Sequence, residues 1–78
     1  MKEYIGQLLI MTKYRISYIE MIKDDFERGL IMLMRKTTIL QNVEQKNAIN
    51  EKIMECTICI NYYDFILQIL NYLSDNLP

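Results

Sequence analysis

The segment from Cys56 to Leu73 is apolar on nearly every side once it is wound into a helix, and this feature constrains the fold more than any other. Its polar side chains form one narrow stripe, made of Thr57, Asn61, Asp64, Gln68 and Asn71. A helix that packs against a single neighbour needs only one apolar stripe. We therefore expect apolar surface to be left over for another protein, either a second copy of the chain or a different partner.

Length and composition favour one small helical domain spanning residues 1–78. A chain of this length has room for only a small core, so packing on a partner would add stability that the chain lacks alone. Two glycines, one proline and 51% hydrophobic residues favour an ordered helical protein over a disordered one. The formal net charge of −1 gives no electrostatic reason to bind nucleic acid or anionic lipid.

Charged residues interrupt every apolar stretch before it reaches membrane length. The longest uncharged run, Phe65 to Ser74, is ten residues, whereas a bilayer is crossed by roughly 20. Charges follow the apolar patch from Leu8 to Met11, and no small-residue cleavage site comes after it. The sequence therefore predicts no membrane span and a cytoplasmic protein.

Apolar residues in the second half recur at alternating intervals of four and three, the heptad spacing of coiled coils. The first row contains Ile49, Ile53, Cys56, Ile60, Tyr63, Leu67 and Leu70. A second row beside it contains Cys59, Tyr62, Ile66, Ile69 and Leu73, and a third contains Ile58, Phe65 and Tyr72. Three apolar rows on one helix indicate more than one contact surface.

The first half has a heptad row of its own. Its members are Leu9, Ile16, Ile19, Phe26, Leu30, Leu33 and Leu40, with Thr12, Lys23 and Thr37 as weaker positions. The row continues through Gly29, so we expect one long helix, straight or bent there, although Asp24 followed by Glu27 could instead cap a second helix. Lys23 with Glu27, and Asp24 with Arg28, have the spacing of ion pairs along a continuous helix.

The two halves meet at a segment of weak helix propensity, where Asn42 is a candidate N-cap with Gln45 three residues later. We place the turn near residues 38–44. Two helices of roughly 30 residues, each about 45 Å long, then form an all-α antiparallel helical hairpin. The first dozen residues, which include Gly6, form either a short helix of their own or a frayed end.

The residue inventory argues against catalysis. The chain has no histidine, so a His-assisted nucleophile and a histidine metal site are both excluded. No glycine-rich phosphate loop or dinucleotide fingerprint is present. Acidic residues such as Asp24 and Glu51 lie among compensating basic ones, as on a solvated surface. We expect no enzyme activity, no cofactor and no small-molecule substrate.

Cys56-Thr-Ile-Cys59 has the C-x-x-C spacing of redox sites and of half a zinc site. A redox pair normally lies at a helix N-terminus, whereas both cysteines here fall within apolar helical rows. Zinc would require two further ligands from a second chain. We interpret the pair as small buried hydrophobic residues without a metal. The alternative is a four-cysteine zinc site shared by two chains, which metal analysis would test.

The aromatic residues of the second half are the best candidates for partner contact, because large aromatics anchor protein interfaces. Met32 and Met34 fall outside the first-half row, which leaves partner contact and simple exposure equally open for them. The predicted partner-binding residues are Ile58, Tyr62, Phe65, Ile66, Ile69, Tyr72 and Leu73.

The size of the chain and the arrangement of its predicted helices resemble those of a known protein family. The chain resembles the helical-hairpin co-chaperones of type III secretion in its small size and its two long helices. The resemblance extends to the second helix, which runs from Gln45 through Glu51, Glu55 and Ile60-Asn61-Tyr62-Tyr63 toward an aromatic end. The resemblance implies a helical-repeat chaperone as partner, and with it a needle subunit held soluble before export. It also implies contacts through Tyr62, Phe65 or Ile69.

Two alternatives use the same apolar rows. One is a homodimeric four-helix bundle of the kind formed by some nucleic-acid-binding regulators. Acidic neighbours dilute the basic residues of the first half, and no basic residue follows Lys52, so we predict no nucleic-acid binding. The other is a phage or flagellar assembly chaperone, which differs only in its partner.

Overall fold

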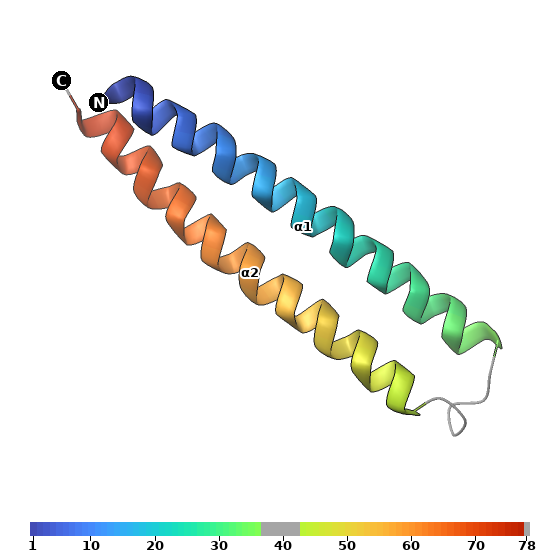
Figure 1. The fold of residues 1–78 in the computed structure, drawn as a ribbon. Coiled ribbons are helices and arrows are strands. Elements are labelled where there is room, and N and C mark those ends of the chain that lie inside the picture. Colours follow the sequence, from blue (N-terminus) through green and yellow to red (C-terminus); the bar gives the residue numbers. More distant parts are fainter. Residues whose placement is uncertain (37–42, 78) are drawn as a thin grey trace.

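The computed structural model describes residues 1–36 and 43–77 and contains two long helices, α1 (Lys2–Lys36) and α2 (Val43–Asn76). They lie side by side and antiparallel, with both chain termini at the same end (Figure 1). The molecule is a rod of 60 × 14 × 12 Å. The predicted all-α helical hairpin is therefore confirmed.

Helix α1 is continuous from its first turn to its last. The Ile5 amide donates a hydrogen bond to the Met1 carbonyl at 3.1 Å, so helical bonding begins at the N-terminus. The expectation of a separate or frayed segment over the first dozen residues is wrong, because Ile5 is buried against α2 and anchors this end. Neither Gly6 nor Gly29 has a positive φ, and the helix passes through both.

The charged side chains near the middle of α1 support the continuous helix. The Lys23 Nζ atom lies 3.9 Å from Glu27 Oε1, and Arg28 donates to the Asp24 carboxylate. Asp24 therefore pairs along the helix instead of capping a new one. Both pairs are the i,i+4 pairs predicted from the sequence, and each adds only a few tenths of a kcal/mol, about 0.3–0.5.

A single heptad seam joins the two helices. On α1, Ile5, Thr12 and Ile16 are buried, and the half-buried members are Leu9, Ile19, Lys23, Phe26, Leu30 and Leu33. On α2 the half-buried members are Ile49, Ile53, Cys56, Ile60, Tyr63, Leu67 and Leu70. Both predicted seam rows are confirmed over these residues. Thr37, Leu40, the Asn42 cap and residues 38–42 of the predicted turn lie outside the described residues, while residues 43 and 44 already belong to α2.

The register of the hairpin is constant along its length. Arg15 lies opposite Tyr63 near the terminal end, where the two side chains share a hydrogen bond. Near the other end, Gly29 and Leu33 border the same groove as Ile49 and Gln45. These positions keep one pairing offset, as a continuous antiparallel seam requires.

The core of this hairpin is thin. The buried residues are each 8% exposed, and α2 contains no buried residue at all. Even the buried Thr12 is satisfied locally, because its hydroxyl donates to the Leu8 carbonyl at 2.7 Å. One seam between two helices covers one stripe of each, so most of the remaining apolar surface faces outward.

We expect Ile16→Ala to lower the free energy of unfolding by about 2–4 kcal/mol, because it removes a buried side chain from the seam between α1 and α2. The matched control is Ile31→Ala on the same helix, where the side chain is 51% exposed and the cost should stay below about 1 kcal/mol. Urea unfolding at one fixed protein concentration measures both. Equal losses for the two variants would contradict the seam.

Candidate partner-binding surface

The third apolar row of α2 points away from α1 and into solvent. Ile58, Phe65 and Tyr72 recur every seven residues and are 61%, 60% and 67% exposed. Met54 continues the same side of the helix and is also exposed. We call Ile58, Phe65 and Tyr72 the outer row. A row of large apolar side chains exposed to solvent is unusual on the surface of a protein that has no partner.

The second row of α2 lies between the outer row and α1, and we call it the α2 flank row. Its members are Cys59, Tyr62, Ile66, Ile69 and Leu73. All are exposed except Ile66, which is half-buried and borders a groove shared with α1. Six of the seven predicted binding residues are therefore exposed, and Ile66 is partly covered by the hairpin itself.

Helix α1 adds an apolar flank on the same side, which the sequence analysis missed. Leu8, Met11 and Arg15 line a groove of about 190 Å³ together with Tyr63 and Ile66 of α2. An open groove of about 470 Å³ next to it is bordered by Tyr14, Arg15, Tyr18, Ile19 and Tyr63. Because residues of both helices border these grooves, the two flanks form one continuous face. Tyr4, Met11 and Tyr18, spaced by seven, are the exposed α1 residues that could have revealed it.

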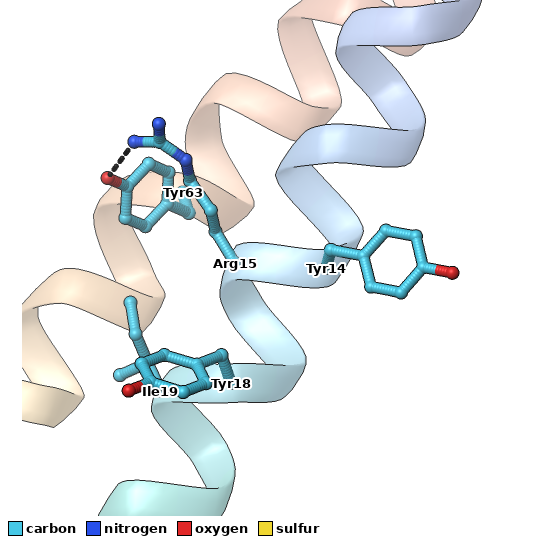
Figure 2. Close-up of a pocket in the computed structure, with 5 residues that line it drawn as sticks. All are labelled: Tyr14, Arg15, Tyr18, Ile19 and Tyr63. Atoms are coloured by element: carbon cyan, nitrogen blue, oxygen red, sulfur yellow. Dashed lines mark hydrogen bonds between the residues drawn. The ribbon is translucent and has the colours of Figure 1, made fainter.

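Arg15 and Tyr63 bridge the two helices on this face. Figure 2 shows the Arg15 side chain extending from α1 to the Tyr63 hydroxyl, while Tyr14 points away from α2. The Arg15 Nη1 atom donates to that hydroxyl at 3.1 Å, and its guanidinium carbon lies 5.9 Å from the ring centroid. The Tyr62 ring meets Tyr63 edge-on, with the centroids 5.7 Å apart. Because this bridge is exposed, it contributes little to the stability of the fold, and its main effect is to orient the Arg15 and Tyr63 side chains.

The opposite flank of α2 is polar. Asn61, Gln68 and Asn71 are exposed, and Thr57 is half-buried with its hydroxyl donating to the Ile53 carbonyl at 3.0 Å. The predicted polar stripe thus faces solvent or satisfies itself within the helix. The hairpin has one polar flank and one apolar flank, with the outer row between them on α2.

The cysteines occupy different environments. Cys56 is half-buried in the seam, while Cys59 is exposed in the α2 flank row. The interpretation of both as buried residues is therefore wrong for Cys59 in the single chain, since the seam reaches only one of the two positions. Among the described residues, no cluster of three or more Cys, Asp or Glu side chains is arranged to hold a metal ion.

Helix α2 also meets the length and hydropathy criteria for a membrane-spanning helix, with a mean hydropathy of 1.2 over its most apolar 18 residues. None of that stretch is buried inside the hairpin. Asn61, Asp64 and Gln68 would lie near the centre of such a span, where polar and ionised groups are costly. The expectation of no membrane span therefore stays a prediction.

Comparison with protein-family models, with curated proteins and with solved structures finds no match to this chain.

Two substitutions at Tyr63 distinguish the contribution of its ring to stability from that of its hydroxyl. Tyr63→Phe removes only the exposed bond to Arg15, so we expect a loss in unfolding free energy below about 1 kcal/mol. Tyr63→Ala empties a seam position, and we expect a loss of about 2–4 kcal/mol. Thermal and urea unfolding of both variants check this. A Phe variant as unstable as the Ala variant would show that the bridge, not the seam, holds the helices together.

Proposed function

We propose that the chain is a non-enzymatic helical binding module that holds a helical protein partner against the outer row of α2. The observation that carries this proposal is the exposure of Ile58, Phe65 and Tyr72, about three-fifths or more each, on a helix whose other side already packs on α1. Helices with such ridges bind in grooves between helices of a partner, with anchors at successive turns.

The proposed contact has the composition of a binding hot spot. Phe65 and Tyr72 each offer about 150–250 Å² of surface and few rotatable bonds, so little conformational freedom is lost on binding. Ile69, Leu73 and Tyr62 belong to the neighbouring α2 flank row and lie beside this ridge. Asn61 and Gln68 border it on the other side and supply a polar rim. An apolar centre with a polar rim is the usual anatomy of a protein interface.

Within this class, we propose an adaptor of the co-chaperone kind, cytoplasmic, whose partner is a helical-repeat chaperone. The support is the hairpin shape, the aromatic end of α2 and the resemblance to type III secretion co-chaperones. A concave helical-repeat surface is long enough to receive a rod of 60 Å. Binding would cover the outer row and complete a core that the hairpin lacks.

Phe65→Glu tests the proposal against a matched control, Asn50→Glu, which adds the same charge at an exposed position on the polar flank of α2, outside the proposed contact. We expect the tagged wild-type chain, expressed in its native cell, to elute with one helical protein in stoichiometric amount. Phe65→Glu should reduce that yield at least ~10-fold, because a charge would be buried at the centre of the contact. Asn50→Glu should leave it unchanged.

Circular dichroism of the purified variants shows whether each is still helical. Equal yields with the two glutamate variants would contradict the proposed surface. Recovery of the chain only with the membrane fraction, and its flotation with phosphatidylcholine vesicles, would instead identify α2 as a membrane-bound helix.

A further inference from the structure

The apolar flank has a second heptad row on each helix. On α1 its members are Tyr4, Leu8, Met11, Arg15, Tyr18, Ile22, Asp25, Gly29 and Met32, at alternating intervals of four and three. On α2 the flank row extends back at the same spacing through Glu55, Lys52 and Ala48. Grooves bordered by members of both rows occur near each end of the hairpin. We call these two rows together the grooved face.

We propose that the grooved face packs against the grooved face of a second copy of this chain, with the two loops at opposite ends, to give a four-helix bundle. The two-fold axis lies across the hairpin, so that α1 packs on α1 of the second copy and α2 on α2. Antiparallel rows then bring together residues that are equally far from the axis.

Opposite charges fix the position of that axis. The α1 row of the grooved face, from Tyr4 to Met32, contains two charged residues, Arg15 and Asp25, and both are exposed. An axis crossing α1 at position 20 places Arg15 of one copy against Asp25 of the other, twice in the dimer. Within the part of the chain that the structure describes, Asp25 forms no ion pair. Its partner in this arrangement is Arg15 of the second copy.

The same axis matches large side chains to small ones. Gly29 and Ala48 border an apolar groove of about 530 Å³. On α1, Met11 and Gly29 are equally far from position 20, so Met11 of one copy faces Gly29 of the other. On α2, Ile66 and Ala48 are equally far from position 57, so they face each other in the same way. Because Arg15 lies opposite Tyr63, positions 20 and 57 are nearly level, so one axis serves both helices. Met11 and Ile66 themselves border a single groove.

Gly29 is explained by this packing and not by the hairpin alone. It lies inside a long helix with a negative φ, where alanine or leucine would be the better helix former. A Cβ atom added there would meet nothing within 4 Å in the chain. The space beside Gly29 is therefore open in one copy and available to Met11 of another.

The exposed area is also what a dimer of this kind requires. The chain exposes 6352 Å², about 1,300 Å² more than a compact monomer of its mass, 9.4 kDa, is expected to expose. Burying that excess on two copies would give an interface of about 2,600 Å², within the range of permanent homodimers. A net charge of −1 opposes self-association only weakly.

The opposite choice of axis, along the hairpin, is disfavoured. It would pack α1 on α2 of the second copy at the same level, so Arg15 would lie near Tyr63 and away from Asp25, and the groove of Gly29 and Ala48 would face itself. An empty space would then remain in the interface, where close packing is favoured.

Charge exchange at Arg15 and Asp25 tests the arrangement by sedimentation equilibrium of the full chain. Arg15→Asp and Asp25→Arg each place like charges together twice per dimer, so each should weaken dimerisation at least ~10-fold. The double variant, Arg15→Asp with Asp25→Arg, restores opposite charges and should return the dissociation constant to within ~3-fold of wild type. A double variant as weak as the singles overturns the proposed register, and a monomeric wild type at ~100 μM overturns the dimer.

Gly29→Leu provides a second test that does not change charge. Leucine fills the groove that receives Met11, so this variant should be monomeric where the wild type is dimeric, although its helicity should not fall. The matched control is Gly6→Leu on the same helix. A Cβ there also meets nothing within 4 Å, but its helical phase places it on the opposite flank of the seam. Equal dimerisation of the two leucine variants would overturn the proposal.

This inference rests on the proposed function only in treating the chain as a binding module, because it uses the grooved face and leaves the outer row free. The two can fail separately. Phe65→Glu should lose the foreign partner and remain dimeric, whereas Gly29→Leu should lose the dimer and keep an outer row that can bind. Loss of dimerisation in both variants would show that one surface serves both contacts, which overturns the assignment of the second copy to the grooved face.

Discussion

The single seam between α1 and α2 is the interaction on which the rest of the structure depends. Two antiparallel helices can bury one stripe of each and no more, however long they are. Among the residues whose burial is described, three of α1 and none of α2 are buried, although α2 is apolar on most of its circumference. Over the residues that the structure describes, one seam joins the two helices, and the exposed rows follow directly from placing an apolar helix in such a hairpin.

The seam could be predicted from the sequence because its heptad spacing is regular and its members are mostly Ile and Leu. Ile5 could not be predicted as a seam residue, because the N-terminal segment with Gly6 looked prone to fray, whereas contact with α2 holds it in place. The α1 part of the grooved face was not evident from the sequence either. A search for apolar rows skips that row, since Arg15, Asp25 and Gly29 interrupt it.

Residue type alone could not separate the environments of neighbouring positions. Cys56 and Cys59 are the same residue three positions apart, yet only the first reaches the seam. Ile66 and Ile69 differ in the same way, because Ile66 borders a groove with α1 and Ile69 is exposed. In each case the direction in which the side chain leaves α2, relative to α1, determines how exposed it is. That direction follows from the pairing of the helices and not from either helix alone. The α2 flank row itself was visible in the spacing, but its proximity to Met11 and Arg15 was not.

The grooved face and the outer row lie at different angles around the hairpin, so a second copy and a foreign partner need not compete. In a four-helix dimer the outer rows of the two α2 helices would lie on the outside of the bundle, available to two partners. Such a molecule would gain its core from the second copy and its function from what binds the outside. The excess of exposed area then has two uses, stability and recognition.

Thermal unfolding of the pure chain over a hundredfold range of protein concentration tests the central claim most directly, namely that the hairpin needs a further protein surface to complete its core. If the second copy supplies that surface, the midpoint temperature rises with concentration, because association stabilises the folded state by mass action. A sharp transition at one temperature across the whole range, in a chain that sediments as a monomer, would contradict the account.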